Sequence, residues 1–350
     1  MKAIKSMSAA GPRLVLGFVL CLSVFQDSPA RVALGTTGPA ASCPINSYMA
    51  EAHGGSAVQA APSDKSPQSA PAATNVQYAS FHSDALGKDV AYAVQLPHSY
   101  DQQPKRRYPV VYFLHGMFGN EREFERRGVA AEIEKLRTDG TIGDLIIVSP
   151  AGGNSFYLNS KAGVRYEDAI VKDLIPYIDK TYRTVANPGG RAIQGISMGG
   201  FGALLIAFKH PEMFSSVTTH CAALFTTLPS TTGDDRRSQF VRSLLGTIFG
   251  DPPDEDFFQA NNPIKLGVAD AAAIKKTGLK IYFDCGEQDR YGFQQTNKVL
   301  DEQLTQAGVP HEFHLFPGNH GWEYMISVAD HSYGFLWKNF NAGKSAGAGK

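Results

Sequence analysis

A serine bracketed by glycines stands at the centre of the stretch GISMG, residues 195–199. An apolar run of strand length, 191–196, leads into it, and an apolar helical pattern follows it directly. A strand, a sharp turn and a helix form the setting in which a Gly-x-Ser-x-Gly motif presents a nucleophilic hydroxyl. The strained backbone of such a serine is tolerated only if the residues two positions away lack bulk. The pattern predicts that Ser197 attacks an acyl carbon; a tight turn with an incidental serine is the alternative.

A serine hydroxyl needs a base to activate it, and the base needs an acid to orient it. In parallel sheets that carry this motif, the chain order is Ser, then Asp or Glu, then His. After Ser197, the loop that follows the apolar run 279–286 contains Asp289, and the loop that follows 311–316 contains His320. We predict Asp289 as the acid and His320 as the base. The rivals lie within or nearer to the predicted strands, and they are Asp284, Glu287, His220, His311 and His314.

The oxyanion of an acyl-transfer reaction needs two backbone N–H donors. Met198, directly after the serine, is one candidate, since this donor belongs to the residue after the nucleophile. The second is expected in the loop after the early apolar run 109–116, where Gly116 allows a close approach and Met117 follows it. The alternative is that this loop is only a turn ahead of the helix predicted for 121–136.

Short apolar runs alternate with helical patterns along most of the chain. The expected strands are 76–83, 89–97, 109–116, 144–150, 191–197, 214–221, 279–286 and 311–316. The clearest expected helices are 166–182, 200–210 and 293–308. The first two strands flank a short turn, which predicts an antiparallel hairpin. The rest predicts an α/β fold with a mostly parallel central sheet covered by helices on both faces, whose ligand site gathers at the carboxyl ends of the strands.

The ends of the chain differ in composition from this middle part. A basic start, a short apolar segment and small residues at Ser28 and Ala30 predict a signal peptide over 1–30, with a retained membrane anchor as the alternative. Residues 31–75 are rich in Ala, Ser, Pro, Gly and Thr and predict a flexible linker. A catalytic domain is expected over 76–341 and a loose tail over 342–350. These features predict a secreted or periplasmic protein without stable membrane insertion after signal cleavage.

Charge and cysteine content narrow the possible partners. Lys and Arg number 33, as do Asp and Glu, so no overall field favours a nucleic acid. Outside the signal segment only Cys43, Cys221 and Cys285 remain, an odd number from which no disulfide pairing can be assigned. No cysteine pair has the spacing of a zinc or redox motif, and HEFH at 311–314 misses the spacing of zinc metalloproteases by one residue. We therefore expect neither a metal nor an organic cofactor.

Six ordered blocks of the sequence together resemble the putative-esterase family of α/β-hydrolases. They are YPVVYFLHGMFGN, IIVSPAGGNSFY, YEDAIVKDLIPYIDKTYRT, AIQGISMGGFGAL, DCGEQD and GNHGWEYM, and the resemblance covers about 76–340. That group includes feruloyl and acetyl-xylan esterases, enterochelin-type esterases, S-formylglutathione hydrolases and the mycolyltransferase antigens. The resemblance implies the α/β-hydrolase fold, with the nucleophile at Ser197, the acid at Asp289, the base at His320 and the oxyanion donors at Met117 and Met198.

Within the group, the predicted signal peptide favours a secreted feruloyl- or acetyl-type esterase that acts on small-molecule or polysaccharide-linked esters through an acyl-enzyme. The alternatives are a mycolyltransferase-type acyltransferase that uses the same triad and a non-catalytic binding module on the same fold. Asn154, Phe156, Tyr157 and Trp322 are the candidates for lining the substrate pocket, and plain packing is the alternative for each.

Overall fold

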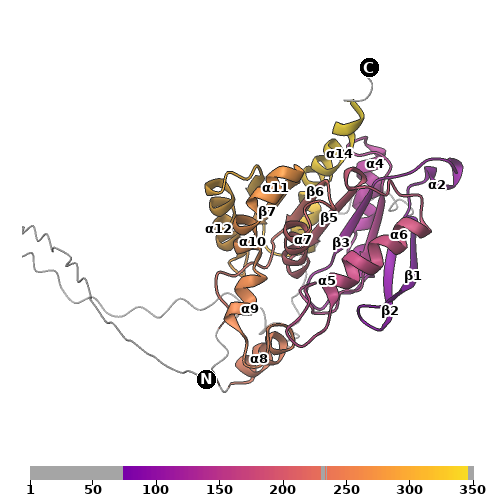
Figure 1. The fold of residues 1–350 in the computed structure, drawn as a ribbon. Coiled ribbons are helices and arrows are strands. Elements are labelled where there is room, and N and C mark those ends of the chain that lie inside the picture. Colours follow the sequence, from indigo (N-terminus) through magenta and orange to yellow (C-terminus); the bar gives the residue numbers. More distant parts are fainter. Residues whose placement is uncertain (1–73, 230–232, 234, 346–350) are drawn as a thin grey trace, which may run out of the picture. The chain divides into compact units, whose positions relative to one another are not determined.

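The computed structural model describes residues 74–229, 233 and 235–345. The predicted signal peptide, nearly all of the predicted linker and residues 346–350 lie outside this part. Within it, strands and helices alternate as the sequence patterns predict (Figure 1).

Eight strands form one sheet in the order β1-β2-β4-β3-β5-β6-β7-β8. They are β1 (Val76–Ser83), β2 (Lys88–Gln95), β3 (Val110–Leu114), β4 (Ile146–Pro150), β5 (Arg191–Ile196), β6 (Ser216–His220), β7 (Lys280–Gly286) and β8 (Glu312–Phe316). The β1–β2 hairpin is antiparallel, as predicted, and β2 pairs antiparallel with β4. All pairs from β4 to β8 are parallel. The prediction of a mostly parallel sheet with an antiparallel hairpin is confirmed.

Helices connect the strands and cover both faces of the sheet (Figure 1). They are α2 (Ser99–Gln102), α3 (Glu123–Arg126), α4 (Val129–Thr138), α5 (Tyr166–Asp168), the π-helical η2 (Ala169–Leu174), α6 (Ile175–Thr181), the 3-10 helix η3 (Pro188–Gly190), α7 (Met198–Lys209), α8 (Arg236–Phe249), α9 (Glu255–Ala260), α10 (Pro263–Ala269), α11 (Ala271–Thr277), α12 (Phe293–Gln306), α13 (Trp322–Ser327) and α14 (Ala329–Ser345).

Side chains alternate between the two faces along each strand, and this alternation creates two apolar cores. In β3, Tyr112 and Leu114 belong to one cluster of buried residues, and Val111 and Phe113 belong to the other. The first cluster includes buried residues of α6, α7, α10 and α12, and the second includes those of α4, α13 and α14. Because both faces are covered, β3 through β6 are buried along their whole length.

Three details differ from the sequence-based expectations. The helix predicted for 121–136 is wrong as a single element, because the chain turns at Gly128 (φ 88°) and divides it into α3 and α4. Residues 342–345, predicted as part of a loose tail, are instead helical, because α14 continues to Ser345 beyond its buried face. The stretch between β6 and β7 contains four helices, α8 to α11, that the patterns did not predict.

Candidate active site

Ser197 lies at the tight turn between β5 and α7, with φ 57° and ψ −120°. This conformation is strained for a residue with a side chain, and close packing of the two flanking glycines allows it. A Cβ on Gly195 would lie 2.1 Å from the Gly199 carbonyl oxygen, and a Cβ on Gly199 would lie 2.0 Å from that of Leu114. Both glycines of the motif are therefore required by backbone packing, which explains their spacing around the serine.

Backbone hydrogen bonds hold this turn in place. The Ser197 N–H donates to the carbonyl of His220 at 3.0 Å, at the end of the neighbouring strand β6. The Ser197 carbonyl accepts the N–H groups of Phe201 at 3.1 Å and Ala223 at 2.9 Å. The strained residue is thus tied to its own helix and to the next loop, and Ser197 keeps only 6% of its surface exposed.

Asp289 and His320 form a buried hydrogen-bonded pair. His320 Nδ1 lies 2.7 Å from Asp289 Oδ2, and their side chains are 7% and 0% exposed. The Tyr291 N–H also donates to Asp289 Oδ1 at 2.8 Å, and the Cys285 thiol lies 3.3 Å from Oδ2. Burial would raise the pKa of the Asp289 carboxyl, but these hydrogen bonds and the His320 charge outweigh it and keep that pKa below its usual value.

The same contacts act on His320 in the opposite direction. Burial would lower the pKa of His320, but the hydrogen bond to Asp289 and the contact with Cys221 outweigh it and raise that pKa to about 9. The imidazole also packs between aromatic rings, with ring centroids 4.7 Å from Tyr291 and 5.6 Å from Phe293. The base candidate is therefore held by its acid on one side and by two rings around it.

Asn319 links the two loops that carry the acid and the base, a role that the sequence patterns did not indicate. Its Oδ1 accepts the N–H of Arg290 at 2.9 Å and the N–H of His320 at 2.7 Å. One side chain therefore fixes the backbone next to both Asp289 and His320. Its place directly before the predicted base was the available signal, but pairing across two loops cannot be derived from spacing.

The rival residues make a separate arrangement. His220 Nδ1 lies 3.0 Å from Asp284 Oδ1, and His220 Nε2 lies 3.0 Å from the Ser332 hydroxyl of α14. All three residues are 0% exposed. His311 contacts Asp301 at 2.9 Å. His314 is on the edge strand β8, in register with Asp284 of β7, and its ring packs against those of Tyr282 and Phe316.

The predicted oxyanion loop lies against the serine turn. A Cβ on Gly116 would be 3.5 Å from Ser197 Cβ, so the two backbones approach closely here. His115 shapes the loop: its Nε2 accepts the Gly152 N–H at 2.9 Å, so its Nδ1 carries the proton and donates to the Gly116 carbonyl at 2.7 Å. Burial lowers the pKa of His115, which favours this neutral form. This supporting histidine was not predicted.

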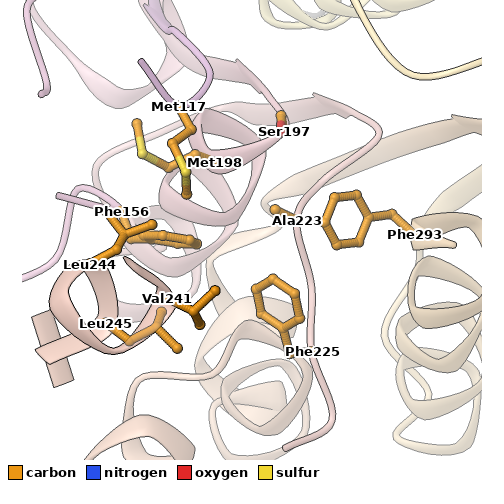
Figure 2. Close-up of a pocket in the computed structure, with 10 residues that line it drawn as sticks. All are labelled: Met117, Phe156, Ser197, Met198, Ala223, Phe225, Val241, Leu244, Leu245 and Phe293. Atoms are coloured by element: carbon orange, nitrogen blue, oxygen red, sulfur yellow. The ribbon is translucent and has the colours of Figure 1, made fainter. Parts of the chain in front are cut away.

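Two pockets open at Ser197, and both are also lined by Met117. One is narrow and apolar, with a volume of about 30 Å³. Figure 2 shows Met117, Met198 and Phe156 on one side of it, Phe225 and Phe293 on the other, and Val241, Leu244 and Leu245 of α8 below. The other is a polar cleft of about 330 Å³, lined by His320, Tyr291, Trp322 and charged side chains.

The four residues predicted for the substrate pocket have different positions. Phe156 lines the apolar pocket and Trp322 lines the polar cleft. Asn154 and Tyr157 line neither of these two pockets. Asn154 Oδ1 accepts the Phe118 N–H at 2.8 Å, and the fully buried Tyr157 donates its hydroxyl to the His115 carbonyl at 3.3 Å. Both therefore support the loop that contains Met117.

Metal-ligating atoms also meet near the acid and the base. One ligand atom each of Cys221, Asp289 and His320 lies within 4.8 Å of the others. These sulfur, oxygen and nitrogen donors suit zinc, but a metal bound there would replace the hydrogen bond between Asp289 and His320. Cys221 and Cys285 are buried free thiols, and Cys43 lies outside the described residues. Among residues 74–229, 233 and 235–345, no helix combines the length and apolarity needed to span a membrane.

The sequence and the fold match known esterases. A family model described as "Putative esterase" matches residues 83–328. An esterase of Mycobacterium tuberculosis is 33% identical over 259 residues, 69% of this chain and 55% of that protein. An endo-1,4-beta-xylanase/feruloyl esterase of Xylanibacter ruminicola is 37% identical over 148 residues, 40% of this chain and 20% of that protein. This chain therefore spans about half the length of the first relative and a fifth of the second.

Solved structures show the same architecture. A ferulic acid esterase superimposes with a TM-score of 0.64 at 27% identity, covering 76% of this chain and 98% of that one. A ferulic acid esterase of Anaeromyces mucronatus, solved with ferulic acid, has a TM-score of 0.59 at 20% identity, covering 79% of this chain and 94% of that one. The second likeness concerns the fold alone.

Proposed function

The chain belongs to the putative esterase family, and from this premise we propose that it is a secreted serine carboxylic-ester hydrolase. The observation that carries the proposal is the buried Asp289–His320 hydrogen bond, because His320 of this pair lines the same cleft as the strained Ser197. Acyl transfer needs such a nucleophile, a base and an acid that orients the base.

In the proposed reaction the Ser197 hydroxyl attacks the acyl carbon while His320 takes its proton. The N–H groups of Met117 and Met198 stabilise the oxyanion. His320 then gives the proton to the departing alcohol oxygen, which leaves an acyl-serine. Water attacks this acyl-enzyme with His320 again as the base, and the acid and free Ser197 are released.

The apolar pocket supports a short acyl group. Its volume of about 30 Å³ is only a few times the roughly 10–15 Å³ that one water requires. An acetyl methyl group fits such a space, whereas a feruloyl ring requires the side chains of α8 to move. An acetyl group therefore fits this pocket better than a feruloyl group or the long acyl chain that a mycolyltransferase transfers.

The nucleophile is tested with two serine variants. We expect Ser197→Ala to abolish hydrolysis of p-nitrophenyl acetate and labelling by a fluorophosphonate. Ser332→Ala is the matched control, because Ser332 has a histidine partner but is buried, and we expect it to keep both. Wild-type hydrolysis rates in Ser197→Ala would show that the proposed nucleophile is wrong.

Secretion is proposed from the basic and apolar segment at the start of the sequence. Expression of the full chain in a bacterial host, followed by fractionation and mass measurement, tests it. We expect the exported protein to lack about the first 30 residues. Full-length protein in the membrane fraction would instead favour a retained anchor.

A further inference from the structure

The two pockets at Ser197 differ in their access to the proposed acid–base group. His320 lines the polar cleft and does not line the apolar pocket. The departing alcohol oxygen must receive its proton from His320, so the alcohol part of the substrate lies in the polar cleft. The acyl part then occupies the apolar pocket. This assignment rests on the proposed function.

Positive charges outnumber negative charges in the lining of the polar cleft. Arg126, Arg127 and Arg290 line it, and Glu123 is the only carboxylate among the described residues that do so. Arg126 and Arg127 both bind Glu123, the latter through Nε at 2.7 Å. The side chains of these arginines are 66% and 50% exposed, whereas that of Glu123 is 4% exposed.

One carboxylate cannot balance two guanidinium groups, and Glu123 accepts one N–H from each. A guanidinium carries five N–H groups, so other donors remain on Arg126 and Arg127. Neighbouring carboxylates are bound elsewhere and do not line the cleft. Glu121 pairs with Arg122 at 3.4 Å, and Glu125 accepts the Tyr78 hydroxyl at 2.6 Å.

Arg290 brings a third positive charge from a separate loop, directly after the acid candidate. Its guanidinium carbon lies 5.0 Å from the centre of the Tyr291 ring. The arginines that line the cleft therefore come from two segments, α3 with its end and the Asp289 loop. Guanidinium groups bind carboxylates and phosphates through paired hydrogen bonds.

We propose that the enzyme prefers esters whose alcohol part carries a carboxylate or phosphate, bound in the polar cleft by Arg126, Arg127 and Arg290. The cleft volume of about 330 Å³ lies at the lower end of the roughly 300–1,000 Å³ of small-molecule sites. The substrate class is then a short-chain acyl ester of an anionic alcohol.

Two acetyl esters of matched shape test the preference. In 4-acetoxybenzoate the alcohol part carries a carboxylate, and in 4-acetoxybenzamide a neutral amide of similar size replaces it. We expect wild-type enzyme to show a kcat/KM about tenfold higher for the anionic ester at low salt, after correction for spontaneous hydrolysis. The ratio should fall as salt is added, because all three arginines are exposed. The acetyl ester of a phosphorylated alcohol distinguishes phosphate from carboxylate as the preferred anion.

Variants of the cleft arginines test whether the cleft causes the preference for the anionic ester. The double variant Arg126→Gln and Arg290→Gln should lower the ratio of the two kcat/KM values to near one, and Lys at both positions should retain most of it. Arg106→Gln is the control, because Arg106 pairs with Asp144 on another part of the surface and should leave the ratio unaltered. Thermal unfolding and the rate on the neutral ester show whether the double variant is folded.

Equal wild-type rates on both esters, or a preference that survives in the folded double variant, would overturn this inference and leave the proposed esterase activity intact. A wild-type protein that hydrolyses neither ester would overturn the proposed function together with the inference.

Discussion

The structure contains two sets of a serine, a histidine and an aspartate, and the sets differ in their access to a pocket and in the backbone conformation of the serine. Ser197, His320 and Asp289 gather at the carboxyl ends of β5, β8 and β7. The second set consists of Ser332, His220 and Asp284. In that set both links of the relay are hydrogen bonds of 3.0 Å, from the serine hydroxyl to the imidazole and from the imidazole to the carboxylate.

Access and backbone shape separate the two sets. Ser332 lies in the regular helix α14 and is fully buried, whereas Ser197 has a strained turn and lines two pockets. The second carboxylate is also closed off, because the hydroxyls of Tyr324 and Tyr282 both donate to Asp284 at 2.9 Å. Hydrogen bonds between a serine, a histidine and an aspartate therefore do not suffice for acyl transfer; the serine must also line a pocket with room for an acyl group.

The second set supports the turn that contains Ser197. The carbonyl of His220 accepts the Ser197 N–H, and the His220 ring is held by Asp284 and Ser332. We therefore expect changes in the second set to act mainly on stability, and changes in the first set to act mainly on catalysis.

The largest difference is expected between the two histidines. His320→Gln should lower kcat/KM by about 10⁶-fold, since loss of the base disables a serine nucleophile. Its melting temperature should fall as well, because the change leaves the buried Asp289 carboxylate without its histidine partner. His220→Gln should lower the melting temperature because it breaks a buried network, while kcat/KM per folded molecule stays within an order of magnitude. Ester hydrolysis and calorimetry on both variants check this, and equal catalytic losses would remove the distinction.

As for the two histidines, we expect the change at Asp289 to act on catalysis and the change at Asp284 to act on stability. Asp289→Asn should lower kcat by about 10⁴-fold, because an amide no longer favours the reactive orientation and charge of His320. Asp284→Asn should reduce the free energy of unfolding by about 3 kcal/mol, since it leaves a buried histidine and two tyrosine hydroxyls with altered partners. Denaturant unfolding measures the second effect. If Asp284→Asn were stable but inactive, catalysis would belong to the second set, and the assignment to Ser197, His320 and Asp289 would be wrong.

The raised pKa of His320 predicts how the activity and the stability of the protein depend on pH. Its neutral form must act as the base, so kcat/KM should fall as the pH drops through a pKa near 9, by about tenfold per unit. The stability depends on pH in the opposite direction. The raised pKa of His320 stabilises the fold below the ordinary histidine value of 6.5, and this stabilisation is lost as the pH rises towards 9. A rate profile with its inflection at or below the ordinary value would contradict the strong coupling to Asp289. In Asp289→Asn the inflection should move down.

The smallest effect is expected from the extra donors on the two carboxylates. Asp289 receives the weak thiol donor of Cys285, where Asp284 receives two tyrosine hydroxyls. Cys285→Ala should therefore lower kcat/KM only about threefold, whereas Tyr324→Phe should act on the melting temperature. Steady-state kinetics and thermal unfolding separate these outcomes. A loss of more than a hundredfold in Cys285→Ala would give the thiol a larger part than its geometry suggests.

Much of the architecture could be predicted from local patterns. Short apolar runs predict the strands because a strand buried on both faces must be apolar throughout, and the β1–β2 hairpin follows from alternation around a short turn. The Gly-x-Ser-x-Gly spacing predicts the turn at Ser197, because only glycine fits where a Cβ would meet a backbone carbonyl. The helices between β6 and β7 were not predicted, although the apolar residues of α8 recur in pairs every four positions from Phe240 to Phe249, and α8 forms one wall of the apolar pocket.

Within the site, the sequence by itself determined the turn around Ser197 and the two loops that hold Asp289 and His320, because these depend on neighbours along the chain. The choice among several histidines and carboxylates rests, in the sequence, on chain order alone, and the tertiary structure adds the contacts that each residue makes. His220 and Asp284 match a relay in residue type but occur in the reverse order along the chain, and parallel pairing of β6 with β7 places them opposite each other inside the sheet. Other features of the site also depend on segments far apart in sequence. They are the hydrogen bonds of Asn319, the support of the predicted oxyanion loop by His115, and the cleft lined by arginines. Such contacts depend on how the strands pack side by side, which local spacing does not specify.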